Sequence, residues 1–217
     1  MAAVRSRARG EKTRQKILDA AEEIFARDGF DAARMEDIAN AVGIQRAGLF
    51  YYYKDKSALY QAMLDTVLSE LLAKMTKELD PELPLLDQVE NCAVAWVDFV
   101  WRRPDFARIL LREGAKTSSF NRDELAKFAR PLMELLQKLL EDAQQQGISQ
   151  GSTGDVVHVA STLAGSTVFM IAVFPSIMSE LSPDANDEER LEVHKREIRK
   201  LTRFLLTGMN RTDDFQS

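Results

Sequence analysis

The side chains best suited to recognition chemistry gather in one short stretch, AVGIQRAGLFYYYKDKSAL. Gln45 and Arg46 carry the amide and guanidinium groups that make paired hydrogen bonds to the edges of adenine and guanine. Tyr51, Tyr52 and Lys56 follow, and phenol and ammonium groups can donate to phosphate oxygens. This mixture indicates contact with double-stranded DNA. Packing of the aromatic block in a core, with solvated cations beside it, is the alternative.

Two short helical patterns flank Gly43 and would position these groups. Apolar residues recur with helical spacing from Met35 to Val42, and a second short segment runs from Arg46 to Tyr53. Two short helices joined at a glycine have the dimensions of a helix-turn-helix, whose second helix lies in the major groove. The sequence therefore predicts this motif over residues 35–53.

Within the second helix, helical spacing separates an inner from an outer side. Phe50 and Tyr53 are expected in the small core, with Leu49 four residues before Tyr53. Ala47 and Gly48 are expected on the outer side, together with Gln45, Arg46 and Tyr51.

Charged residues near these helices admit two interpretations. Asp55 is expected to cap the helix that follows, which places Lys56 in its first turn. A cation there opposes the helix dipole, a cost that makes sense if a phosphate is the partner. Arg34 offers a further phosphate contact, and Glu36 offers a contact to cytosine. Ordinary solvation is the alternative for Lys56, Arg46 and Glu36.

Bulk composition supports a globular chain with a basic N-terminal part. Of 217 residues, 45% are hydrophobic and 29% are charged, with a net charge of −5. Residues 1–56 hold 11 basic and 9 acidic side chains, which leaves 18 basic and 25 acidic ones, a net −7, in the remainder. This asymmetry suggests a basic arm on a small domain, followed by an acidic body.

Cysteine and histidine content argues against several classes of protein. A single cysteine, Cys92, precludes an intramolecular disulfide, and the N-terminus lacks an apolar signal core. We therefore expect a cytoplasmic protein. With only His158 and His194 beside that cysteine, no metal cluster or cofactor is expected. No catalytic constellation is apparent, so an enzyme is not expected.

Every long segment has helical periodicity, and none alternates for long enough to indicate a sheet. The predicted fold class is all-α with about nine helices. Those of the second domain are expected over 85–102, 105–113, 121–146, 153–179 and 187–208. Residues 156–179 contain no Asp, Glu, Lys or Arg, but their polar residues and acidic flanks favour a buried helix over a membrane span. The predicted organisation is a basic flexible arm (1–10), a helix-turn-helix domain (11–56), a connecting helix (57–80) and a second helical domain (81–217).

Aromatic residues of the second domain, mixed with a few uncharged polar ones, describe either a small-molecule pocket or an ordinary helical core. The last helix carries an apolar strip from Leu191 to Leu205 that either closes its own core or contributes to a subunit interface. Spacing alone leaves both questions open.

Residues 11–60 resemble the DNA-binding domain of the TetR family of bacterial transcriptional regulators. The matching motifs are ILDAAEEIFARDGFDAARMEDIANAVGI and LFYYYKDKSAL. The chain departs from the family pattern at three positions. Phe50 replaces a usual tyrosine, Gly48 a usual serine or threonine, and Arg34 a frequent capping hydroxyl.

The resemblance implies a homodimer through residues about 153–208 that binds a palindromic operator on double-stranded DNA. It also implies a repressor released by a hydrophobic small molecule. The pocket residues expected on this basis are Trp96, Phe99, Val100, Phe106, Phe128, Thr162, Ser166 and Phe169. The rival hypotheses are an architectural DNA-binding protein without an effector and a small-molecule-binding protein with a vestigial helix-turn-helix.

Overall fold

The computed structural model describes residues 2–115, 119–148, 153–181 and 186–208, in which the chain is helical and has no strands. Residues 1, 116–118, 149–152, 182–185 and 209–217 lie outside the described residues. The helices are α1 (Ala2–Ala32), α2 (Met35–Val42), α3 (Arg46–Tyr52), α4 (Lys56–Thr76), α5 (Leu85–Trp101), α6 (Pro104–Gly114), α7 (Ser119–Gln145), α8 (Thr153–Ala172), α9 (Phe174–Leu181) and α10 (Asp187–Gly208).

The all-α prediction is confirmed, with two differences in the helices. The single helix expected over 153–179 is divided into α8 and α9, because Pro175 has no backbone N–H to continue α8. The flexible arm expected over residues 1–10 is instead helical from Ala2 onward, where no proline or glycine interrupts the chain before Gly10.

Helix α1 is kinked near its end at Gly29, whose φ of 79° and ψ of 164° form a conformation that is almost restricted to glycine. Glycine suits this position because a residue without a Cβ adopts this conformation at little cost. The buried stripe of α1, which includes Ile17, Ala21 and Phe25, faces α2, α4 and α6.

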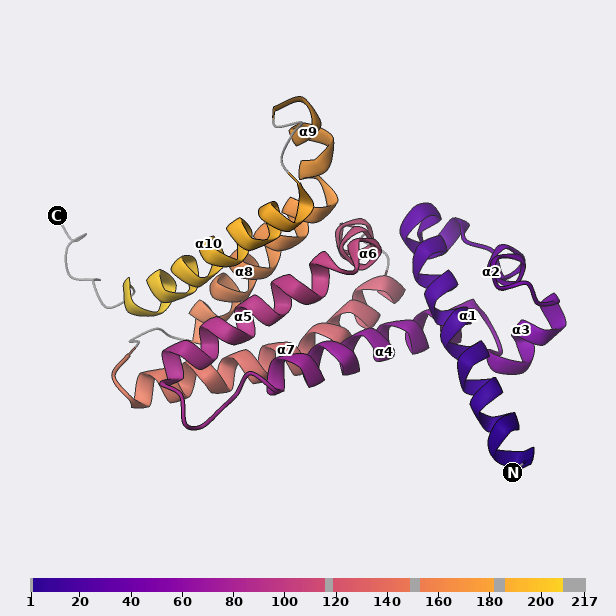
Figure 1. The fold of residues 1–217 in the computed structure, drawn as a ribbon, viewed down its shortest axis with the longest axis horizontal. Coiled ribbons are helices and arrows are strands. Elements are labelled where there is room, and N and C mark those ends of the chain that lie inside the picture. Colours follow the sequence, from indigo (N-terminus) through magenta and orange to yellow (C-terminus); the bar gives the residue numbers. More distant parts are fainter. Residues whose placement is uncertain (1, 116–118, 149–152, 182–185, 209–217) are drawn as a thin grey trace.

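Helix α4 belongs to two cores at once. Asp55 caps it as predicted, since its side chain accepts a hydrogen bond of 2.7 Å from the amide of Ala58. Its first half carries Tyr60, whose ring meets those of Phe25 and Phe30 edge-on at 5.0 Å. Its second half packs against α5 and α7. Residues 2–55 and the start of α4 form the head, and the rest forms the body (Figure 1).

Helix α10 lies along α5 and α8 in the body. Leu191, His194 and Ile198 are buried against these helices, so this strip closes the core of its own chain. The His194 Nε2 atom lies 3.2 Å from the Thr167 hydroxyl, and burial lowers the pKa of His194 below its ordinary value. A subunit interface on α10 would therefore use a face other than the apolar strip from Leu191 to Leu205.

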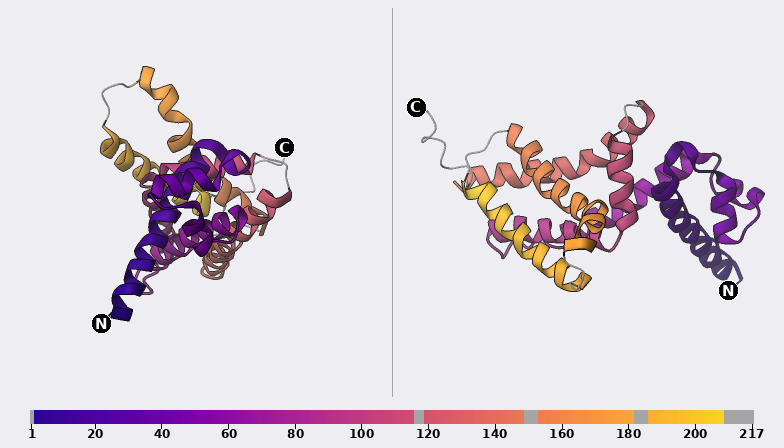
Figure 2. Two further views of the ribbon diagram at one scale, coloured as in Figure 1. Left: turned by 90° about the vertical axis from the view of Figure 1, so that its right-hand side faces the viewer. Right: turned by 90° about the horizontal axis from the view of Figure 1, so that it is seen from above.

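The head lies at one end of an elongated molecule, as the view from above in Figure 2 shows. Helix α4 runs from the head into the body, and α6 packs against both α1 and α8. A change in the body can therefore reach the head along two routes. Within the described residues, no helix is long and apolar enough to cross a membrane.

Candidate nucleic-acid interface and apolar cavity

The α2–α3 unit has the turn geometry of a helix-turn-helix. Gly43 ends α2 with a φ of 75°, and its amide donates to the carbonyls of Ala39 and Asn40. The amide of Ile44 returns to the carbonyl of Ala39 at 3.0 Å, which closes the turn. Leu49 and Tyr53 then anchor α3 in the head core, where both are buried.

The outer side of α3 presents the groups expected to meet DNA bases. Gln45, Arg46 and Ala47 are exposed at its N-terminal end, and Tyr51, at 85%, is the most exposed large hydrophobic side chain among the described residues. Gly48 is half-buried, and a Cβ at this position would meet only the Cβ of Ile44, at 3.9 Å. The side of α3 at Gly48 is therefore not covered by the rest of the protein.

Phe50 does not lie in the small core. It is 39% exposed on α3, because it is one position beyond the buried Leu49 and therefore points about 100° away from it. The guanidinium carbon of Arg46 lies 5.3 Å from the centre of its ring. Phe50 thus lies on the exposed side of α3 beside Arg46, and sequence reasoning missed this because aromatic character suggested burial.

Lys56 is half-buried and makes hydrogen bonds within the chain. Its ammonium donates to the carbonyls of Asp31 (2.9 Å) and Ala33 (3.0 Å) and lies 4.8 Å from the centre of the Phe30 ring. Lys56 therefore has a structural role in addition to the phosphate contact expected from the sequence. Lys56 ties the start of α4 to the end of α1 and to the turn between α1 and α2.

The remaining cations frame this face. Arg34 is exposed at the N-cap of α2 in extended conformation and makes no side-chain capping bond. Arg14 is exposed on α1, and its guanidinium lies 5.5 Å from the centre of the Tyr53 ring. Tyr52 is half-buried and meets Tyr51 edge-on at 5.4 Å. Arg9, Lys12 and Lys16 are also exposed on α1, so the head presents the positive charge that phosphate binding needs.

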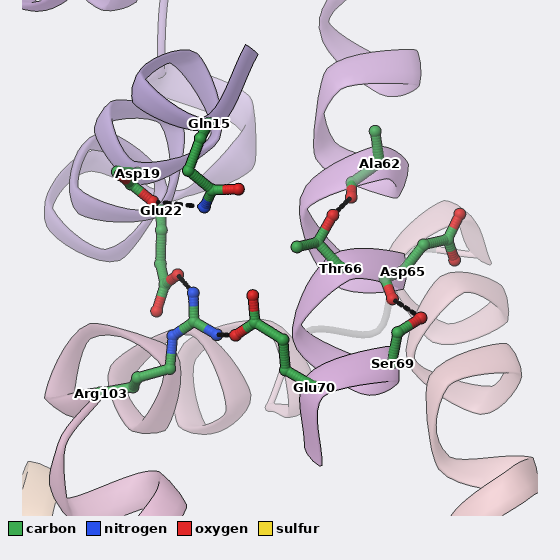
Figure 3. A network of polar contacts seen from close by, with 9 residues as sticks. All are labelled: Gln15, Asp19, Glu22, Ala62, Asp65, Thr66, Ser69, Glu70 and Arg103. Atoms are coloured by element: carbon green, nitrogen blue, oxygen red, sulfur yellow. Dashed lines mark hydrogen bonds and ion pairs between the residues drawn. The ribbon is translucent and has the colours of Figure 1, made fainter. Parts of the chain in front are cut away.

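A three-way ion pair joins the head to the body. Arg103, at the start of α6, places one Nη atom 3.1 Å from the Glu22 carboxylate of α1 and bonds the Glu70 carboxylate of α4 with the other (Figure 3). Burial raises the pKa of Glu22, and the nearby Arg103 opposes that rise. The guanidinium of Arg103 thus connects α1 of the head with α4 and α6.

A second polar junction lies at the Gly29 kink. Arg112 of α6 donates a 2.7 Å hydrogen bond to the carbonyl of Arg27, and the buried Glu113 carboxylate accepts one of 3.3 Å from the amide of Phe30. A Cβ on Gly29 would lie 3.2 Å from the Arg112 side chain. The end of α6 therefore holds the end of α1 on both sides of the kink.

The body contains an apolar cavity of about 310 Å³ between α4, α5, α6, α7 and α8. Its volume falls in the range of small-molecule sites. The lining is aliphatic and aromatic, with Cys92 as its one thiol. It consists of Met75, Val89, Cys92, Ala93, Trp96, Leu110, Leu125, Phe128, Ala129, Leu132, Met133, Leu135, Leu136, Leu139, Ala160, Leu163 and Ala164.

The expected pocket residues divide into three groups. Trp96 and Phe128 line the cavity. Phe99, Val100 and Phe106 are buried in the core of the body but are not among the lining residues. The third group, Thr162, Ser166 and Phe169, is exposed on the outer side of α8. We therefore leave this last group out of the proposed pocket.

Sequence reasoning also missed most of the lining from α7. Leu125, Phe128, Leu132, Leu135 and Leu139 recur at intervals of three and four residues, which is the signal that could have identified this face. Because such a stripe also describes any core helix, spacing alone does not distinguish a cavity wall from a filled core.

Comparison with known proteins agrees with the architecture. Residues 17–63 match the family model for bacterial regulatory proteins, tetR family. The chain is 28% identical to the HTH-type transcriptional regulator SrpR of Pseudomonas putida over 142 residues (64% of this chain, 65% of SrpR). It is 25% identical to the HTH-type transcriptional repressor NicS of Pseudomonas putida over 185 residues (82% of this chain, 85% of NicS).

Two further similarities extend this result. The transcriptional regulator FadR from Bacillus subtilis, solved in complex with stearoyl-CoA, superposes with a TM-score of 0.69 at 15% identity, covering 89% of this chain and 98% of that one. The uncharacterized HTH-type transcriptional regulator TtgW of Pseudomonas putida is 30% identical over 113 residues, which are 51% of this chain and 81% of TtgW. The chain therefore belongs to the TetR family of bacterial regulatory proteins and is a DNA-binding transcriptional regulator of the helix-turn-helix type.

Proposed function

We propose that this protein is a homodimeric repressor that leaves a palindromic operator when a hydrophobic effector enters the cavity of the body. The observation that carries the proposal is an apolar cavity whose α6 wall also contacts the head. Leu110 of α6 lines the cavity, while Arg112 and Glu113, two and three residues later, hold the end of α1. The protein acts in this scheme by binding and not by catalysis.

The lining indicates the class of effector. No charged side chain is among the lining residues that the structure describes, so an ion placed there would lose its hydration without compensation. The enclosed part of the effector is accordingly an alkyl or aromatic group. The structure of Bacillus subtilis FadR with stearoyl-CoA shows that this fold accommodates an acyl thioester, which makes an acyl chain our first candidate.

Exposed apolar side chains on two neighbouring helices support the dimer. Val157 and Phe169 protrude from α8, and Val193 and Phe204 protrude from α10. The described part of α8 carries no charged residue after Asp155, so its outer face would be desolvated at little cost. A second copy related by a two-fold axis would cover both helices with the same surface.

The dimer would present two copies of α3 to DNA. Two-fold symmetry matches a palindromic site with half-sites one or more helical turns apart, about 34–36 Å for one turn. An effector changes operator occupancy only if it binds one spacing of the heads more tightly than the other. The junctions of α6 with α1 and of α4 with α1 are where such a difference would be transmitted.

The test combines operator selection with effector binding. The full chain is used to select bound duplexes from random DNA, and the affinity of the selected site is measured with and without acyl-CoA thioesters of graded length. We expect a palindrome, and weaker binding when a long-chain thioester is present. A selected site whose affinity no thioester changes would contradict the effector proposal, and no selected site would contradict the operator proposal.

A pair of matched substitutions assigns the effect to the cavity. Ala164→Phe places a ring in the lining, whereas Ala126→Phe makes the same change at an exposed position of α7 outside the lining. Only the first is expected to abolish the response and the thermal stabilisation by a bound thioester, which amounts to about 2.7 kcal/mol at a hundredfold excess over Kd. Equal responses in both variants would place the effector elsewhere.

A further inference from the structure

An ion pair joins the first turns of α2 and α3. The Arg46 Nη1 atom lies 2.8 Å from Glu36 Oε1, with exposed side-chain fractions of 62% and 46%. The same guanidinium lies over the Phe50 ring, 5.3 Å from its centre. A carboxylate and an aromatic face thus hold one cation on the side of the head that is free of the body.

Helix electrostatics explain why this contact is well placed. Arg46 is the first residue of α3, where the positive end of the helix dipole disfavours a cation. Glu36 stands in the first turn of α2, where a carboxylate is favoured. Its charge offsets the unfavourable position of Arg46. Phe50 follows Arg46 by four residues and therefore lies on the same face of α3, with its ring available to the guanidinium.

We propose that Glu36 and Phe50 are positioning residues, which orient Arg46 toward a guanine of the operator and reduce its binding to phosphates of unrelated DNA. This inference rests on the operator recognition proposed above. A guanidinium has five N–H donors in one plane, and Glu36 engages one of its nitrogens. Enough donors remain for the paired contact to guanine O6 and N7.

The low net charge of the Glu36–Arg46 pair favours sequence-specific binding over binding to the phosphates of unrelated DNA. Contacts to phosphates gain affinity by releasing counterions, in proportion to the positive charge brought to the backbone and without regard to sequence. With Glu36 beside it, Arg46 brings little net charge. Guanine offers two acceptors at the spacing of a guanidinium edge, so geometry replaces charge as the source of affinity. A bidentate contact of this kind discriminates between bases by about 5- to 150-fold.

The test compares Glu36→Gln with Asp37→Asn. Both remove one negative charge from the first turn of α2, but the ion pair to Arg46 comes from Glu36. Dissociation constants are measured at one salt concentration for the selected operator, for operators with single guanine pairs exchanged, and for an unrelated duplex. Circular dichroism checks that both variants keep their helices.

We expect Glu36→Gln to bind the unrelated duplex about fivefold more tightly at 0.15 M salt, the effect of one additional phosphate contact. It should also lose about fivefold or more of its discrimination at one guanine. Asp37→Asn should leave discrimination unchanged. Phe50→Tyr keeps a ring face and should preserve the guanine preference, whereas Phe50→Leu should weaken it.

Three outcomes would overturn the inference. One is that Glu36→Gln and Asp37→Asn shift all affinities alike and leave base discrimination intact. Another is that Arg46→Ala retains the guanine preference of the unaltered protein. The last is that the unaltered protein selects no sequence, which would overturn the proposed operator recognition as well. In the first two outcomes the proposed function stands and only the positioning role fails.

Discussion

Removal of Arg103 measures how much its ion pairs at the head–body junction contribute to the stability of the folded chain. The substitution Arg103→Met keeps most of the side-chain length but leaves the Glu22 carboxylate without its cation (Figure 3). Breaking a fully buried pair costs about 3–5 kcal/mol. The Arg103 and Glu22 side chains remain 19% and 10% exposed, so some water reaches the site. We therefore expect a loss of about 2 kcal/mol, or about 4–8 °C in Tm.

The loss should depend on pH in a defined direction. Burial raises the pKa of Glu22 in the folded protein, so its contribution to stability is fully present below its ordinary pKa. That contribution is lost as pH rises through the raised value. Removing Arg103 removes an interaction that opposes the rise, so the pKa of Glu22 increases further. The penalty of Arg103→Met should accordingly be smaller near pH 5 than near pH 7.5.

Urea unfolding of four proteins at both pH values tests this reasoning. They are the unaltered chain, Arg103→Met, Glu22→Gln and the double variant. The double variant should recover most of the loss at pH 7.5, because no ionised carboxylate is left buried and unpaired. An equal penalty at both pH values, together with a double variant no more stable than Arg103→Met, would refute the account.

Three further substitutions test other contacts. Lys56→Met should cost about 1–3 kcal/mol in urea unfolding, because two carbonyls lose their donor; unchanged stability would mean that water replaces the ammonium. Gly29→Ala should cost about 1–3 kcal/mol for its backbone conformation alone (φ 79°, ψ 164°), measured by thermal unfolding, and an unchanged Tm would contradict the strain. Phe204→Asp should yield folded monomers by sedimentation, and a persisting dimer would place the interface elsewhere.

Local features of the fold could be predicted from the sequence because they depend on neighbouring residues. Gly43 ends α2 and Asp55 caps α4, for reasons confined to a single turn of chain. The helix-turn-helix follows from these signals together with helical spacing. Helical periodicity is also a local signal, so the all-α class could be predicted. The division of residues 153–179 into α8 and α9 was not predicted.

Features that depend on distant residues were not accessible in this way. Lys56 bonds carbonyls 23 and 25 residues earlier, and Arg103 pairs with Glu22 across 81 residues. The rotation of α8 is a third example. Because α8 has no charged residue after Asp155, its sequence does not show which of its sides faces solvent. Thr162 and Ser166 were therefore expected to face inward, but they face outward. Packing against neighbours decides such a rotation.

The single cysteine of the chain makes the cavity observable by simple chemistry. Burial raises the pKa of Cys92 to about 12, and its thiol donates to the carbonyl of Met75 at 3.4 Å. At pH 8 roughly one thiol in 10⁴ is ionised, and only the thiolate reacts with an alkylating reagent. Labelling therefore proceeds chiefly through molecules in which the body has opened. The labelling rate therefore measures how often the cavity wall opens, and it needs no engineered probe. A ligand bound in the cavity would lower this rate.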